Sequence, residues 1–115
     1  MPHIIVNTNL TLGKEQKDAF KNEFGKAITI LPGKTEQVLM VDISDGHTIY
    51  FRGEEPEQVA HVEVRLYGTS SFESKSEFTR EVYRILNDIL GLKENEATVC
   101  FGEYSVWGAN GKLKY

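Results

Sequence analysis

The sequence of 115 residues has little of what several large classes of protein require. It contains a single cysteine, Cys100, so an internal disulfide is excluded. No apolar run reaches the length of a membrane span, and the first residues lack the basic and then apolar layout of a signal peptide. Lys and Arg are scattered among more numerous acids, with a net charge of −4, which argues against nucleic-acid binding. We expect a cytoplasmic protein with no nucleic-acid or membrane partner; export without a leader stays open.

Motifs for metal and cofactor chemistry are missing as well. The histidines His3, His47 and His61 do not have the spacing of zinc ligands. The chain shows no glycine-rich phosphate loop and no Ser-His-Asp arrangement. Cys100 has no C-x-x-C partner, and we expect it to be a small buried residue of a strand. The sequence therefore predicts neither a metal site nor a cofactor.

A repeated pattern is present across one domain, residues 1–115. Residues 4–6 and 38–43 read as strands, and residues 13–31 read as a helix between them. Apolar residues mark one face of this helix, and residues of the same kind recur 58 positions later: Phe20, Phe24, Ala27, Ile28 and Leu31, then Phe78, Val82, Ile85, Leu86 and Ile89. The spacing predicts a duplicated β-α-β unit, with halves at about residues 2–45 and 59–104.

The second half supplies matching strands at residues 59–66 and 97–101. Ser74 and Glu77 fit an S-x-x-E capping box at the start of the second helix. We predict an α/β (α+β) fold in which a four-stranded mixed sheet carries both helices on one face and the strands of each unit run parallel. Residues 48–51 read as a short extra strand.

The face of the sheet away from the helices mixes apolar and charged residues. Such a face suits packing against other subunits better than contact with water. We therefore expect a homo-oligomer. Residues 48–51 and the C-terminal interface segment, residues 105–115, are the expected edges that pair with neighbouring chains.

Pro2 is the candidate catalytic residue. While Met1 is attached, the Pro2 nitrogen is a tertiary amide without basicity, whereas removal of Met1 makes it a free secondary amine. An α-amino group titrates near pH 8, and burial lowers its pKa further, towards the range that proton-transfer catalysis needs. The plain alternative is that Pro2 is only a common, well-processed second residue.

The chain resembles the tautomerase superfamily, and within it the branch of macrophage migration inhibitory factor and D-dopachrome tautomerase. The resemblance spans nearly the whole chain and rests on the order of its motifs: Pro2, Val6-Asn7-Thr8-Asn9, Gly33-Lys34, Phe51, Gly53, Glu55-Pro56, Gly68 and Trp107-Gly108-Ala109-Asn110-Gly111, together with the duplicated unit.

The resemblance implies a homotrimer whose sheets line a central barrel, with pockets at subunit interfaces. It implies that Pro2 shuttles a proton between carbon and oxygen of an aryl α-keto acid such as phenylpyruvate. Lys34 then holds the substrate carboxylate, Tyr67 contributes its backbone to the pocket, and Trp107 forms a wall. Lys34 also has a plainer interpretation, as a cation favoured by a helix end, and Tyr67 and Trp107 as interface packing.

The chain departs from the family pattern at the pocket walls. Ala109 replaces a common aromatic residue, and Thr98 and Cys100 stand where the family often has tyrosine and asparagine. A cytokine-like trimer that binds a protein receptor therefore stays an alternative, as does a ligand-binding regulatory domain with a ferredoxin-like repeat. Dehalogenation and decarboxylation of small acids are further superfamily chemistries. Arg52 and Arg65 are possible second cations, and Tyr115 is a possible cap on a neighbouring pocket.

Overall fold

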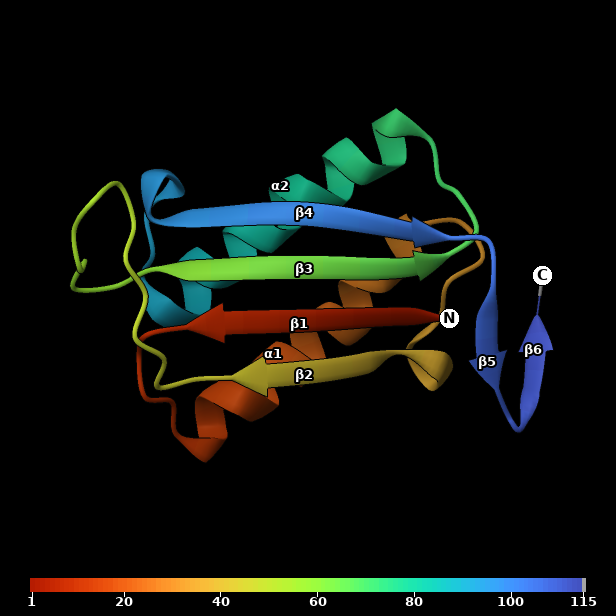
Figure 1. Cartoon of the computed structure of the whole chain (residues 1–115), viewed down its shortest axis with the longest axis horizontal. Helices are drawn as coiled ribbons and strands as arrows, with labels where there is room; N and C mark the ends of the chain where they lie inside the picture. Colours follow the sequence, from red (N-terminus) through yellow and green to blue (C-terminus); the bar gives the residue numbers. More distant parts are fainter. Residues whose placement is uncertain (115) are drawn as a thin grey trace.

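The structure is a computed structural model and describes residues 1–114. Its strands and helices follow one another along the chain as in Figure 1: β1 (Pro2–Thr8), α1 (Lys14–Ala27), β2 (Met40–Ser44), β3 (Ala60–Tyr67), α2 (Phe72–Leu90), β4 (Ala97–Tyr104), β5 (Trp107–Ala109) and β6 (Lys112–Lys114). Short 3₁₀ turns, η1 (Ile28–Ile30), η2 (Glu36–Val38) and η3 (Glu94–Glu96), lie between them.

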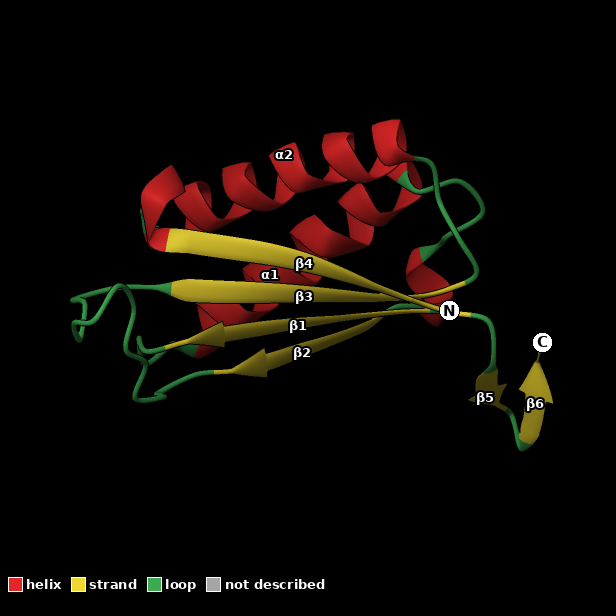
Figure 2. Cartoon of the chain, turned by 45° about the horizontal axis from the view of Figure 1, so that its top comes forward, coloured by secondary structure: helices red, strands yellow, loops and turns green. Residues whose placement is uncertain are grey.

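One mixed sheet of four strands forms the centre of the molecule, in the order β2-β1-β3-β4. The pairs β1–β2 and β3–β4 are parallel, and the two central strands β1 and β3 are antiparallel. Both helices lie on the same side of this sheet, which leaves its other face uncovered (Figure 2). The predicted fold class is therefore confirmed.

The duplication extends to the register of the strands. Val6 pairs with Ile43 in the first unit, and Val64 pairs with Phe101 in the second, so both partners are displaced by the same 58 residues. Each helix is followed by a glycine with positive φ at equivalent positions, Gly33 and Gly91. The two halves thus have one backbone plan.

The core lies between the helices and the sheet. Alternate residues of β1 and β3 are buried, as a strand with one covered face requires. The largest buried side chains are aromatic and come from both helices: Phe20, Phe24 and Phe78. Phe20 stacks on Phe24 with ring centroids 5.9 Å apart. Burial of this shared apolar layer stabilises the arrangement of helices over the sheet.

Three local predictions are wrong. Residues 48–51 form no strand; the chain there makes a single bridge between Phe51 and Glu54 around a tight turn. The cap of α2 is Ser71, three residues before the predicted cap Ser74; its side chain accepts a hydrogen bond from the Ser74 backbone N–H, and the helix begins at Phe72. Cys100 is exposed in this chain, because it points to the uncovered face of β4.

Within the described residues, the C-terminal strands β5 and β6 pair with each other alone and form an antiparallel hairpin. This hairpin projects from the end of the sheet at which β1 begins (Figures 1 and 2). Val106 and Leu113 are exposed there. Among residues 1–114, no helix has the length and apolar character that crossing a bilayer requires.

Candidate functional site

Pro2 begins β1 and is buried, with Leu66 of β3 as its partner in the sheet. Met1 is attached, so the Pro2 nitrogen is an amide in this structure. The Met1 carbonyl oxygen accepts a hydrogen bond from the Tyr67 backbone N–H at 3.2 Å. Tyr67 is the last residue of β3, which runs antiparallel to β1. The start of one central strand and the end of the other therefore meet at one point.

Lys34 reaches the same point from the end of the first helix. Gly33 takes a left-handed conformation (φ 79°), which reverses the chain after η1, and the Lys34 backbone N–H donates to Leu31 at 3.1 Å. The Lys34 ammonium then donates to the Tyr67 carbonyl oxygen at 2.7 Å. Both backbone polar groups of Tyr67 are thus occupied, the N–H by Met1 and the carbonyl by Lys34.

The surroundings of Met1, Lys34 and Tyr67 favour the neutral form of an amine. Burial, followed by the positive charges of Lys34 and then Lys114, lowers the pKa of the Met1 amine below its ordinary value of 8.0. Each of these effects disfavours the protonated form. An amine held at this position is consequently a free base over a wider range of pH than an amine in water.

Trp107 lines a hollow of about 470 Å³ between the hairpin and the uncovered face of the sheet, with a lining made of His3, Met40, Arg65, Tyr104, Val106, Trp107 and Gly108. Tyr104 and Trp107 meet edge to face, with ring centroids 6.0 Å apart. The hollow adjoins the start of β1 through His3, the residue after Pro2. Pro2, Lys34 and Tyr67 therefore form one cluster, and Trp107 lies in the neighbouring hollow.

The two arginines considered as further cations already have partners. Arg65 pairs with Glu63, which raises the pKa of the arginine and lowers the pKa of the carboxyl. Arg52 lies over the Phe51 ring and donates to the Asn95 carbonyl at 3.1 Å. His3 likewise has an acidic neighbour, with Nε2 3.4 Å from Asp42 Oδ2.

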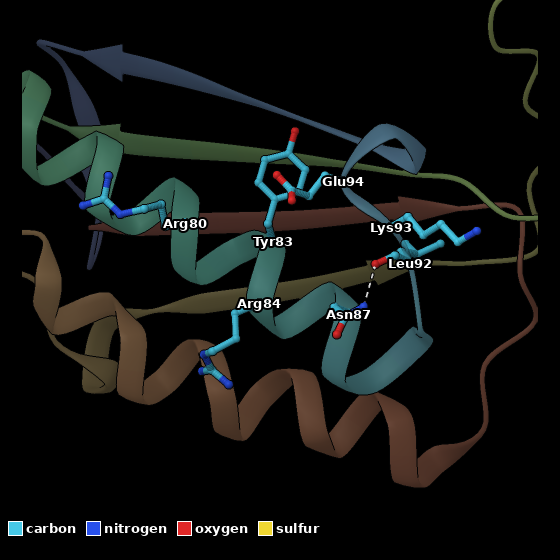
Figure 3. Close-up of a pocket in the computed structure, with 7 residues that line it drawn as sticks. All are labelled: Arg80, Tyr83, Arg84, Asn87, Leu92, Lys93 and Glu94. Atoms are coloured by element: carbon cyan, nitrogen blue, oxygen red, sulfur yellow. Dashed lines mark hydrogen bonds between the residues drawn. The ribbon is translucent and has the colours of Figure 1, made fainter.

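A larger hollow, of about 560 Å³, lies on the outer surface of α2 and is drawn in Figure 3. Several of its polar groups are already engaged in the fold. Arg84 points toward α1 and pairs with Glu81, Glu23 and Asp88, which raises its pKa. The Tyr83 hydroxyl donates to the Ala97 carbonyl, and the Asn87 amide donates to that of Leu92. This chemistry fastens α2 to its surroundings and lies apart from Pro2.

The sequence patterns did not point to His3, Met40, Tyr104 or Lys114 as neighbours of the site. For Lys114, the signal is its place opposite Trp107 in the hairpin, which only the structure shows. Within residues 1–114, no cluster of three or more His, Cys, Asp or Glu could hold a metal ion. The expectation for Tyr115 lies outside the described residues.

The described fold, a duplicated β-α-β unit with a proline opening the first strand, is that of the tautomerase class. The chain belongs to the macrophage migration inhibitory factor family, whose model matches residues 1–112. Comparison with curated protein sequences gives no significant match.

Solved structures with this fold come from several organisms. MIF2 of Leishmania major has a TM-score of 0.90 at 20% identity, over 98% of this chain and 97% of that one. The homologue of Prochlorococcus marinus has a TM-score of 0.84 at 21% identity, over 96% and 97%. The protein of Giardia lamblia has a TM-score of 0.71 at 24% identity, over 89% and 98%. At these identities the likeness concerns the fold.

Proposed function

We propose that this protein is a cofactor-independent keto–enol tautomerase of aryl α-keto acids, with Pro2 as general base and acid once Met1 has been removed. One observation carries the proposal: the Met1 carbonyl oxygen accepts from the Tyr67 N–H beside the Lys34 ammonium. An acceptor oxygen next to a cation marks a position that also suits one oxygen of a carboxylate.

Removal of Met1 has two effects at the start of β1. It converts the Pro2 amide into a secondary amine, and it leaves the Tyr67 N–H without its acceptor. The carboxylate of an α-keto acid then takes the vacated position, where it accepts from Tyr67 and faces Lys34. An ammonium has three donors, so Lys34 can keep its bond to the Tyr67 carbonyl while it binds substrate.

The bound acid presents its C3 hydrogen to the Pro2 nitrogen. The amine takes this proton, the C–H electron pair becomes the carbon–carbon double bond of the enolate, and the carbonyl oxygen gains the negative charge. The resulting Pro2 ammonium returns the same proton to that oxygen and completes the enol. A base whose pKa lies near the working pH serves both steps. Burial, and then the charges of Lys34 and Lys114, lower the pKa of the Met1 amine, and a Pro2 amine would be next to the same groups.

Replacement of Pro2 tests this function. Pro2→Gly and Pro2→Ala, both with Met1 removed as shown by intact mass, are expected to lose most phenylpyruvate tautomerisation, on the order of 10²-fold, as typical for loss of a general base. Their oligomeric state is the control and should not change. Full activity in both variants would refute the role of Pro2.

We further propose that the active form is a homotrimer with its pockets between subunits. The uncovered sheet face and the projecting hairpin support this, because Met40 and Leu113 are about 63% and 62% exposed in one chain. Apolar side chains exposed to this degree in one region suit burial against a second copy.

A cytokine-like trimer that engages a protein receptor is the second candidate. Thr98 and Cys100 favour it, because both lie on the uncovered face and bond to His61 instead of offering an aromatic wall. Inactivity of Met1-free protein toward a broad panel of α-keto acids would favour this candidate over the enzyme.

A further inference from the structure

The C-terminal hairpin brings a lysine to the hollow beside the proposed site. Lys114 of β6 is the direct cross-strand partner of Trp107 of β5. Side chains of directly opposed residues project from the same face of a strand pair, with Cβ atoms about 5 Å apart. Trp107 lines the hollow. Lys114 therefore stands next to the Trp107 side of the hollow.

The other basic side chains that line this hollow already have acidic partners. Arg65 pairs with Glu63, and His3 faces Asp42. Within residues 1–114, Lys114 forms no ion pair with an acidic side chain. Like Lys34, it can therefore offer its positive charge to a ligand.

Two cations consequently flank the start of β1. Lys34 is anchored on the Tyr67 carbonyl at 2.7 Å, on the side where a substrate carboxylate is expected. Lys114 belongs to the hairpin, and Figures 1 and 2 both place this hairpin beside the N-terminus. In agreement, the charges of both lysines lower the pKa of the Met1 amine. A monocarboxylic substrate uses only one of these two cations.

We propose that the site takes α-keto acids with a second carboxylate at their far end, and that Lys114 binds this second carboxylate. This inference rests on the proposed function, because it takes Lys34 and Tyr67 as the partners of the first carboxylate. The body of the substrate then lies along the wall formed by Tyr104 and Trp107. Lys114 acts on specificity and takes no part in the proton transfer.

The test compares phenylpyruvate with 4-carboxyphenylpyruvate, which differ only by a carboxylate at the far end of the ring. The kcat/KM of Met1-free protein should be higher for the dicarboxylate. Lys114→Met should lower the ratio of the two kcat/KM values about fivefold, the upper range for a solvent-exposed ion pair. Lys114→Arg should restore the ratio, and added salt should reduce it in the unmodified protein.

Lys112→Met is the matched control, because it removes the same charge from the same strand opposite Ala109 instead of Trp107. The ratio should stay unchanged in this variant. An absence of preference in the unmodified protein, or a preference that survives Lys114→Met, would overturn the proposal.

Binding separates this inference from the catalytic one. Trp107 is the single tryptophan of the chain, so quenching of its fluorescence reports occupancy of the hollow directly. If neither acid is turned over but the dicarboxylate binds more tightly in a manner that depends on Lys114, the tautomerase proposal fails and the role of Lys114 stands. Equal dissociation constants for the two acids contradict the role of Lys114 whether or not turnover occurs.

Discussion

Lys34 owes its position to the glycine before it. Gly33 has a φ of 79°, and its surroundings leave open space, so the conformation and not crowding selects glycine there. The reversal at Gly33 sends the Lys34 side chain back toward the end of β3, where it bonds to Tyr67. The residue type and the turn are both visible in the sequence. The contact is not, because Lys34 and Tyr67 lie 33 positions apart along the chain.

Replacement of Lys34 should affect substrate binding more than the proton transfer. In Met1-free protein, Lys34→Gln is expected to raise the KM for phenylpyruvate about tenfold, equivalent to about 1.4 kcal/mol, with a smaller change in kcat. Initial-rate kinetics measure both. Lys26→Gln, which removes an exposed charge from the last turn of α1, serves as the control. An unchanged KM in Lys34→Gln would show that this ammonium does not hold the carboxylate.

At the scale of elements, the features that follow from periodicity and duplication could be predicted from the sequence. The helix faces around Phe20 and Phe78 and the alternation in β3 gave the layers correctly, because burial repeats with the period of each element. The prediction of a strand at residues 48–51 was wrong, since β-branched and aromatic residues suit a strand only where a partner strand is present. The start of α2 was misplaced because Ser71 and Ser74 are both good caps, and tertiary packing decides between them.

Glu103 joins the end of β4 to the start of α2. One carboxylate oxygen accepts from Lys75 at 2.8 Å, and the other accepts from the Ser70 backbone at 2.7 Å. The hydrogen bond from Lys75, followed by that from Ser70, lowers the pKa of Glu103 below its ordinary value of 4.5. A carboxyl with a lowered pKa in the folded state stabilises the protein above pH 4.5, and this contribution disappears as the pH falls through the folded-state pKa.

Glu103→Gln is therefore expected to lower the free energy of unfolding by about 1 kcal/mol at pH 7, with the difference shrinking below pH 4.5. Urea denaturation at fixed protein concentration, repeated across this range, measures the effect. The exposed Glu94→Gln should be nearly neutral throughout. A Glu103→Gln deficit of the same size at every pH would contradict the ionic origin of this contact.

At the scale of the whole molecule, one chain leaves apolar surface uncovered on one side. The apolar layer between the helices and the sheet is buried, whereas Met40, Val106 and Leu113 are exposed around the edge of the sheet and the hairpin. The sequence indicated this asymmetry through the mixed residues of the uncovered face. It could not show which side chains of a second copy would complete the pockets of the proposed trimer, because such contacts would join different chains.

Disruption of the hairpin surface should weaken assembly. Leu113→Asp is expected to shift the proposed trimer toward monomer in sedimentation equilibrium, because a charge in an apolar interface loses its hydration. Phe72→Asp is the matched control: Phe72 is 79% exposed but lies at the start of α2 in the helical layer. A trimer that withstands Leu113→Asp, or dissociates equally in both variants, would place the interface elsewhere.

The most direct test concerns the nitrogen of Pro2 itself. The same purified chain is assayed for phenylpyruvate tautomerisation before and after treatment with a methionine aminopeptidase, and intact mass reports the state of the terminus. Protein that retains Met1 should be inert, and activity should rise in proportion to the fraction of chains that begin at Pro2. Equal activity in Met1-bearing and Met1-free chains would contradict catalysis by the Pro2 amine.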